Sequence, residues 1–197
     1  MGQTVDYENV ALWGVLFLII SAFTAKKVKK LLDARSDFKL KMLPIARDEQ
    51  SRSGIHPDVT ITQAAHESGW GQSGLTLKAN NLFGFTGEAW EAAGKPVIKL
   101  PTKEYVKGKW ITVNRPFRAY SSWAESVRDW GHLISTKPRY QDAYALAKQG
   151  DVKAFAVAVQ KAGYATDPAY ANSLAAVFDR VKSIVLPPNG IPPGATV

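Results

Sequence analysis

A long uncharged apolar segment near the N-terminus limits how much of this chain can build a folded core. Residues 9–25 contain no charged side chain and include the run VALWGVLFLIISAF. This length lies at the lower limit for a helix that spans a bilayer. We therefore expect residues 1–25 to form a single-pass transmembrane anchor that contacts lipid through residues 9–25. A buried soluble helix and a cleaved signal peptide are alternatives, but Asp6 and Glu8 precede the run where a signal peptide carries positive charge.

Basic residues follow the apolar segment directly. The cluster KKVKK at residues 26–30 would hold the C-terminal side in the cytoplasm under the positive-inside rule. We expect residues 26–37 to form a basic juxtamembrane linker, which either lies along lipid phosphates or is a solvated helix. At the other end, residues 187–197 read as a Pro/Gly-rich tail that we expect to be extended.

The remaining residues, 38–186, are enough for one core of about 150 residues. The stretch GIHPDVTITQAAHESG predicts a helix with Glu67 in its last turn, because Pro57 suits a first turn and Gly69 a stop. β-Branched and aromatic residues on both sides of a Lys-Gly-Lys turn predict a hairpin within residues 95–120. Three helical stretches then follow: SWAESVRDWGHLI, DVKAFAVAVQKAG and PAYANSLAAVFDRVKSIV. We expect an α+β domain that is mainly α.

The composition excludes several kinds of chemistry. The chain has 197 residues, no cysteine and a net charge of +8. Without cysteine there is no disulfide framework, thiol nucleophile or thiolate metal site. The positive charge indicates an anionic partner, such as nucleic acid, a lipid surface or an acidic polysaccharide. Because the basic residues are spread along the chain and no recognition motif appears, we expect no specific nucleic-acid partner; a basic DNA-binding protein is the alternative. Composition does not predict the oligomeric state.

Carboxylates are the acid and base groups that this sequence offers. The histidines, His56, His66 and His132, are scattered, and His66 is not paired with a second histidine at zinc-protease spacing, so we expect no metal site. No Gly-x-Ser-x-Gly elbow or phosphate-binding glycine loop is present, and we expect no cofactor. Glycoside cleavage is the reaction that commonly runs on carboxylates alone. One or two tryptophans would offer flat faces to sugar rings, although most of them suit packing.

Four sequence motifs occur in order over about residues 38–184: GIHPDVTITQAAHESGWGQSGLTLKANNLFGF, then TKEYVKGKW with PFRAYSSWAESVRDW, then RYQDAYA, then AGYATDPAYANSL. Together they resemble glycoside hydrolase family 73, the β-N-acetylglucosaminidases that include the flagellar-assembly peptidoglycan hydrolases. The resemblance implies a lysozyme-like, mainly helical fold with a cleft between a helical lobe and a β-hairpin lobe. It also implies peptidoglycan as the partner and cleavage of the β-1,4 bond between N-acetylglucosamine and N-acetylmuramic acid.

The resemblance further implies roles for three residues. Glu67, in ESGWG, matches the general acid that protonates the glycosidic oxygen, and an apolar wall such as Trp70 would favour its protonated form. Glu104, in TKEYVKG, matches a second acidic position on the hairpin, where it would activate a water or stabilise positive charge on the sugar. Tyr164, in AGYATDP, matches a cleft tyrosine that would orient the water or the N-acetyl group. The alternatives for the second acidic role are Glu88, Glu91 and Glu125.

Substrate binding is expected beside the acid and in the motif NNLFG. Trp70 would contact the substrate. The motif would shape the cleft floor through Asn80, Asn81, Phe83 and Gly84. Asp167 and Tyr170 are expected to fix a loop and to start the last helix. The chain departs from common family members at His66, beside the acid, which leaves open whether His66 tunes Glu67.

Several alternatives remain open on the sequence alone. Inversion, retention through a covalent intermediate and attack by the substrate's own acetamido oxygen are all compatible with these residues. So are a muramidase or lytic transglycosylase, and a non-catalytic wall-binding or membrane-scaffold protein with the same fold. Peptidoglycan lies outside the cytoplasmic membrane, whereas the basic cluster favours a cytoplasmic domain. We therefore expect a membrane-anchored protein of the bacterial envelope or of a phage virion membrane, acting in wall penetration, lysis or remodelling.

Overall fold

The computed structural model describes residues 34–106 and 108–186, with the side chains of residues 104–106 left out. The expected transmembrane segment at residues 9–25 and the expected tail at residues 187–197 lie outside the described residues. Within the described ranges, no helix combines the length and the apolar character that a bilayer crossing needs.

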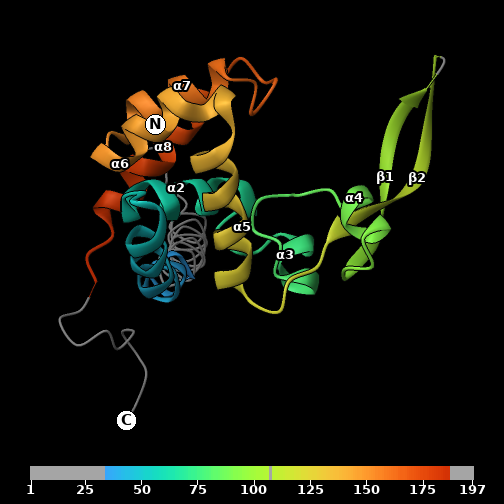
Figure 1. Cartoon of the computed structure of the whole chain (residues 1–197), viewed down its shortest axis with the longest axis horizontal. Coiled ribbons are helices and arrows are strands. Elements are labelled where there is room, and N and C mark those ends of the chain that lie inside the picture. Colours follow the sequence, from blue (N-terminus) through green and yellow to red (C-terminus); the bar gives the residue numbers. More distant parts are fainter. Residues whose placement is uncertain (1–33, 107, 187–197) are drawn as a thin grey trace, which may run out of the picture.

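The described chain forms a helical body and a separate hairpin lobe (Figure 1). The body contains a helix over residues 34–53 and the following elements: α2 (Pro57–Ser68), α3 (Gly74–Ala79), α5 (Trp123–Thr136), the short 3₁₀ turn η1 (Pro138–Tyr140), α6 (Gln141–Gln149), α7 (Val152–Lys161) and α8 (Tyr170–Ser183). The lobe contains α4 (Glu88–Ala92), β1 (Val97–Val106) and β2 (Lys109–Arg118). This arrangement confirms the prediction of a mainly helical α+β fold with a β-hairpin.

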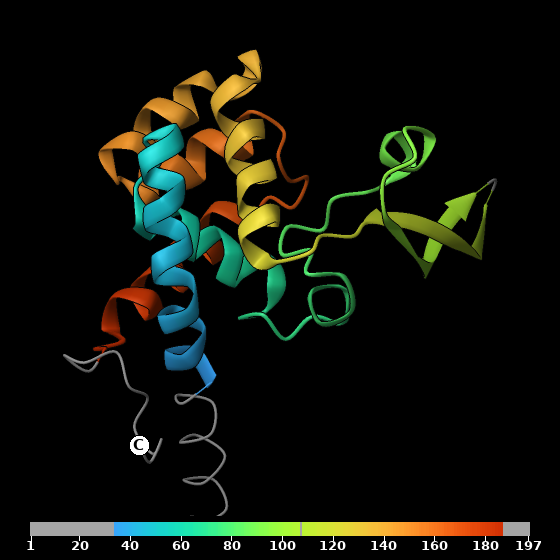
Figure 2. The ribbon, with the colours of Figure 1, turned by 60° about the horizontal axis from the view of Figure 1, so that its bottom comes forward.

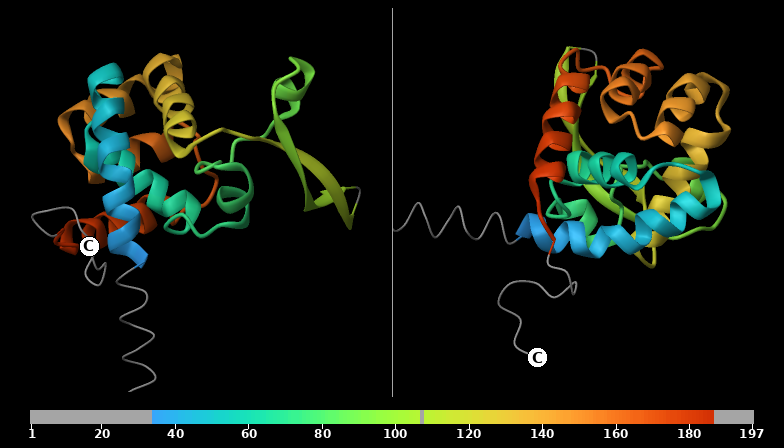
Figure 3. Two further views of the ribbon diagram at one scale, coloured as in Figure 1. Left: turned by 90° about the horizontal axis from the view of Figure 1, so that it is seen from below. Right: turned by 90° about the vertical axis from the view of Figure 1, so that its left-hand side faces the viewer.

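The hairpin is a two-stranded antiparallel sheet that projects away from the helices (Figures 1 and 3). Its register runs from Val97 opposite Arg118 to Val106 opposite Lys109, so the chain reverses at the predicted Lys-Gly-Lys position. Backbone hydrogen bonds join the base of the hairpin to the segment that precedes α4, from Arg118 N to Phe85 O at 3.0 Å and from Gly87 N to Pro116 O at 2.8 Å. The base of the hairpin is therefore hydrogen-bonded to the segment that leads into the lobe.

Aromatic and aliphatic side chains from all the long helices form the core of the body. Trp130 of α5 is completely buried and stacks on Phe83 with ring centroids 5.2 Å apart. The other large side chains that are essentially inaccessible come from different helices and include Tyr140, Phe155, Met42, Ile61 and Leu174. Because these residues are distant in sequence, the body depends on long-range packing.

The helix over residues 34–53 is part of this core (Figure 2). Phe38 is 3% exposed and Met42 is fully buried. Lys39 Nζ donates hydrogen bonds to the carbonyl oxygens of Val181 and Ile184, each at 2.8 Å. These carbonyls lie at the C-terminal end of α8, where the helix has no intrahelical partners for them and where a cation is favourable. Lys39 therefore caps α8.

Candidate active site

Glu67 lies in the last turn of α2, as the sequence predicted, because the helix stops sharply after it. Gly69 caps α2 in the left-handed conformation with φ 57°. Gly71 also has a positive φ, and a Cβ atom there would lie 2.6 Å from the Trp123 ring. Ser68 Oγ donates to Ala64 O at 2.5 Å and accepts from Gly71 N at 2.7 Å. The turn that follows Glu67 is thus fixed by glycine geometry and by a buried hydroxyl.

The carboxyl group of Glu67 is partly buried and held by two donors. Its side chain is 21% exposed. Oε1 accepts hydrogen bonds from the Tyr170 hydroxyl at 2.7 Å and from Gln63 Nε2 at 3.1 Å. His66 Nδ1 lies 3.6 Å from the same oxygen, and the His66 ring packs edge-on against Tyr170. A carboxyl group that is both fixed and reachable from solvent is suited to proton transfer.

Tyr164 lies near this carboxyl group, on the segment between α7 and α8. Its hydroxyl oxygen is buried, and its ring centroid is 6.0 Å from that of Tyr170. Burial, followed by the charge of Glu67, raises the pKa of the Tyr164 hydroxyl well above its ordinary value. Tyr164 therefore keeps its proton at neutral pH and can act only as a neutral hydrogen-bonding group. Tyr164 is therefore close enough to sense the charge of Glu67, and its role toward the water or the N-acetyl group stays a prediction.

Trp70 lies on the turn after Glu67 and contacts the helix over residues 34–53. Its ring packs edge-on against Phe38 with centroids 5.8 Å apart, and the Arg35 guanidinium lies 5.2 Å above it. Trp70 has a positive φ of 61°, which is unusual for a residue with a Cβ atom. These contacts fasten the turn to the N-terminal helix. A contact between Trp70 and substrate stays a prediction.

The motif NNLFG joins the helical body to the hairpin lobe. Asn81 is 1% exposed, and its Nδ2 donates to Phe85 O and Arg118 O, each at 2.9 Å. Its Oδ1 accepts from Phe85 N at 3.1 Å. Asn80 Nδ2 donates to Tyr120 O at 3.0 Å. The two amide groups therefore bind the backbone of both connecting segments. Phe83 packs in the core on Trp130, and Gly84 adopts a positive φ of 71°.

Glu104 lies on β1, where its Cα atom pairs with that of Ile111 on β2. Its side chain is outside the described part of the structure, so its role as the second acidic group stays a prediction. The three alternatives have other partners. Glu88 accepts from Arg115 Nε at 2.8 Å, which lowers the pKa of Glu88, and Glu91 pairs with Lys99 at 2.9 Å. Glu125 accepts from the backbone nitrogen and the hydroxyl of Ser121, at the start of α5.

The sequence interpretation did not identify Gln63 as a site residue and gave Tyr170 only a structural role. Gln63 could have been found, because it lies one helical turn before Glu67 and faces the same side of α2. Tyr170 does start α8, as expected, but its hydroxyl also reaches Glu67 from 103 positions away. In residues 34–106 and 108–186, no group of three or more histidine and carboxylate side chains is arranged to hold a metal ion.

The chain is similar in sequence to a known protein family and to several curated proteins. The glucosaminidase family, described as mannosyl-glycoprotein endo-beta-N-acetylglucosaminidase, matches residues 43–183. The peptidoglycan hydrolase FlgJ of Salmonella typhimurium is 35% identical over 191 residues, covering 92% of this chain and 58% of that protein. The exo-glucosaminidase LytG of Bacillus subtilis is 40% identical over 131 residues, covering 64% of this chain and 44% of that protein.

A solved structure shows the same fold. The C-terminally truncated glycoside hydrolase domain of Salmonella typhimurium FlgJ superposes with a TM-score of 0.63 at 34% identity, covering 77% of this chain and 99% of that domain. The chain spans 58% or less of the length of these two curated relatives.

Proposed function

This chain belongs to the glucosaminidase family, and on that premise we propose that it is a peptidoglycan hydrolase with Glu67 as its general acid. The bond cleaved is the β-1,4 bond between N-acetylglucosamine and N-acetylmuramic acid. The observation that supports the proposal most directly is the Glu67 carboxyl group itself, 21% exposed and fixed by Tyr170 and Gln63. The similarity to FlgJ and LytG supports the same reaction class.

The reaction begins with proton transfer from Glu67 to the glycosidic oxygen. The bond between that oxygen and the sugar C1 atom breaks, its electron pair goes to the oxygen, and positive charge develops on the sugar ring. Glu104 then activates a water or stabilises this charge, and Tyr164 orients the water or the N-acetyl group. The position of the Glu104 carboxyl group relative to the substrate decides the route. The reaction proceeds with inversion at C1, with retention at C1, or through attack by the acetamido oxygen of the substrate.

The test is digestion of purified peptidoglycan by the full chain in mild detergent, with fragments identified by mass and by their reducing ends. Reducing N-acetylglucosamine ends support the proposal. Reducing muramic acid ends would indicate a muramidase, and anhydromuramic ends a lytic transglycosylase. An intact substrate would favour a non-catalytic wall-binding protein.

The Glu67→Gln variant tests the role of the acid. Gln keeps an acceptor oxygen for Tyr170 but cannot donate a proton as an acid, so we expect turnover to fall by about 10²- to 10⁴-fold with little change in melting temperature. Asp179→Asn is the control, because Asp179 forms an exposed ion pair with Lys153 and is not a candidate for either acidic role. A large loss of melting temperature in Glu67→Gln, or equal activity in the two variants, would contradict the assignment.

We also propose that residues 9–25 hold the domain at a membrane of the bacterial envelope or of a phage virion. The support is the uncharged apolar run followed by KKVKK. Flotation with lipid vesicles compares the full chain with a chain that lacks residues 1–25. We expect only the full chain to float with the vesicles after a high-salt wash, and equal recovery of both chains in the soluble fraction would refute the proposal.

A further inference from the structure

Three polar groups converge on a single oxygen of Glu67. The Tyr170 hydroxyl and Gln63 Nε2 donate to Oε1 at 2.7 and 3.1 Å, and His66 Nδ1 lies 3.6 Å from the same atom. All of these contacts are made to Oε1. The two oxygens of the carboxyl group are therefore in different surroundings.

The two donors are themselves held in place. Gln63 is fully buried and also donates to the Tyr170 hydroxyl at 2.5 Å. Tyr170 is 5% exposed, and its ring contacts the rings of His66 and Tyr164 with centroids 5.0 and 6.0 Å away. Burial and the charge of Glu67 raise the pKa of the Tyr170 hydroxyl, so this hydroxyl stays protonated and remains a donor. Neither donor is free to turn away from Glu67.

We propose that Tyr170 and Gln63 are positioning residues that give the two carboxyl oxygens of Glu67 different roles. This inference rests on the proposed function. Oε1 is kept as the acceptor of two hydrogen bonds, so the acidic proton resides on Oε2. In the first step the Oε2–H bond breaks, the proton passes to the glycosidic oxygen, and Glu67 is left as a carboxylate whose Oε1 already has its two donors.

The same contacts stabilise the transition state. Negative charge develops on the Glu67 carboxyl group as its proton leaves, and hydrogen bonds to an ionised acceptor are stronger than those to a neutral one. Donors that are aimed at the group before the charge appears need no reorganisation during the step. Tyr170 and Gln63 should therefore contribute mainly to kcat and little to KM.

The variants Tyr170→Phe and Gln63→Leu remove one donor each and keep side-chain volume nearly constant. Tyr144→Phe is the matched control, because the Tyr144 hydroxyl donates to Ser53 O at 2.5 Å and is not a contact of Glu67. The measurements are kcat and KM on soluble glycan chains over a range of pH, the melting temperature, and the titration of the Glu67 carboxyl carbon followed by ¹³C NMR. The full chain is used in each case.

We expect Tyr170→Phe and Gln63→Leu each to lower kcat by about 10- to 100-fold, with KM changed by less than about twofold. A donor favours the ionised form of a carboxyl group, so its removal should let Glu67 keep its proton to higher pH. The alkaline limb of the pH profile and the NMR titration of Glu67 should then both move to higher pH. Tyr144→Phe should move neither of them, even if it lowers the melting temperature.

The NMR titration separates this inference from the proposed function. If the parent chain does not cleave peptidoglycan but the Glu67 titration still moves in Tyr170→Phe, the proposed reaction is wrong and the positioning contact is real. If the parent chain cleaves and both variants keep the kcat and the Glu67 titration of the Tyr144→Phe control, Tyr170 and Gln63 are only packing residues and the inference is overturned. A variant that loses melting temperature and kcat without any change in the Glu67 titration overturns it as well.

Discussion

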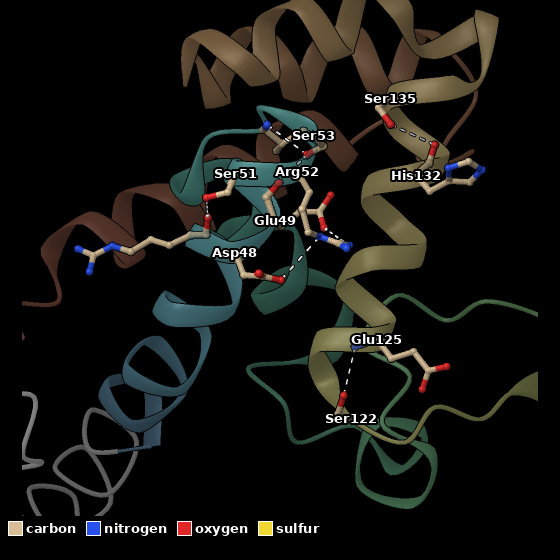
Figure 4. A network of polar contacts seen from close by, with 11 residues as sticks. Asp48, Glu49, Ser51, Arg52, Ser53, Ser122, Glu125, His132 and Ser135 are labelled. Carbon is tan, nitrogen blue, oxygen red and sulfur yellow. Dashed lines mark hydrogen bonds and ion pairs between the residues drawn. The ribbon is translucent and has the colours of Figure 1, made fainter.

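Glu49 is a charged residue that the helical body buries almost completely. It lies on the helix over residues 34–53, is 3% exposed, and has Arg52 as its ion-pair partner at 3.2 Å (Figure 4). Its carboxyl group faces α5, on which His132 and Ser135 follow further along the helix (Figure 4). Burial raises the pKa of Glu49 above its ordinary value of 4.5, because removal from water disfavours the ionised form. The hydrogen bond and charge of Arg52 oppose this shift and do not cancel it.

This raised pKa makes a pH-dependent contribution to stability. Above pH 4.5 the unfolded chain ionises Glu49 while the folded chain still holds the proton. In this window the folded state binds more protons than the unfolded state. The contribution of Glu49 to the free energy of unfolding therefore falls as pH rises toward its folded pKa. We expect the free energy of unfolding of the parent chain, minus that of Glu49→Gln, to decrease as pH rises across this window. Urea denaturation at a series of pH values measures it.

The control for that prediction is Asp48→Asn. Asp48 contacts the same arginine at 3.7 Å, but its side chain is 59% exposed. The Asp48→Asn substitution therefore removes a negative charge near Arg52 without removing a buried carboxyl group. A difference between the parent chain and Glu49→Gln that stays constant from pH 4.5 upward would show that Glu49 is not coupled to folding as described.

Single residues were predictable from the sequence where local geometry decides their place. Pro57 and Gly69 set the two ends of α2, and those ends put Glu67 in the last turn. The partners of Glu67 were less accessible, because Tyr170 reaches it from a helix that begins 103 positions later. The amides of Asn80 and Asn81 were expected to shape the cleft floor and to satisfy both backbone and sugar groups. The structure gives their backbone partners, and their contact with sugar stays a prediction.

At the scale of elements, α5 and the helix over residues 34–53 approach each other through a glycine. A Cβ atom on Gly131 would lie 1.9 Å from Glu49 Oε1 and 2.5 Å from its Cδ atom. These distances are far below contact distance, and the carboxyl group is enclosed by packed helices. A side chain at position 131 would therefore clash with Glu49 of the neighbouring helix. This clash explains why glycine occupies the position, although glycine destabilises a helix interior.

We expect Gly131→Ala to lower the free energy of unfolding by about 1–3 kcal/mol, because the added methyl group overpacks the contact. In a Glu49→Ala background the clashing atoms are absent, and the same change should be neutral or stabilising by up to about 1 kcal/mol through helix propensity. Urea denaturation of the four chains gives this double-mutant cycle. Gly74→Ala in α3 is the control, because a Cβ atom there meets nothing within 4 Å. Equal costs of Gly131→Ala in both backgrounds would locate the strain elsewhere.

The elements that were predicted correctly carry strong local signals. The hairpin was recognised by β-branched and aromatic residues around a Lys-Gly-Lys turn, and α5, α7 and α8 lie in the three helical stretches expected after it. The short helices α3 and α4 were not predicted, since six and five residues are too few to show a helical period.

At the scale of the whole molecule, two connecting segments hold the hairpin lobe to the helical body (Figures 1 and 2). Asn81 binds the backbone of both segments. Asp129 of α5 accepts from Tyr120 Oη and from Arg118 Nη1, each at 2.5 Å, and thereby ties the second segment to the body. The two-lobed form was implied by the family resemblance, whereas these ties depend on contacts across the fold that no local pattern encodes.

The helical body includes residues that precede the family match. The family match begins at residue 43, but Phe38, Lys39 and Met42 precede it and belong to the body. Each buried side chain of this size stabilises the fold by about 1.5–3 kcal/mol. A fragment of residues 43–183 loses Phe38 and Met42 together with the cap that Lys39 places on α8. That sum is a large part of the roughly 5–15 kcal/mol that stabilises a typical domain.

We therefore expect a fragment of residues 34–186 to be folded and active, and a fragment of residues 43–183 to have a much lower melting temperature. Activity should suffer further, because Phe38 packs against Trp70 on the turn that follows Glu67. Phe38→Ala in the longer fragment isolates this contact, and we expect it to lower kcat as well as the free energy of unfolding, the latter by about 3–5 kcal/mol. Thermal denaturation and peptidoglycan digestion of the three chains measure both effects. Equal melting temperatures of the two fragments would mean that the domain begins at the family match and that the helix over residues 34–42 packs on it without stabilising it.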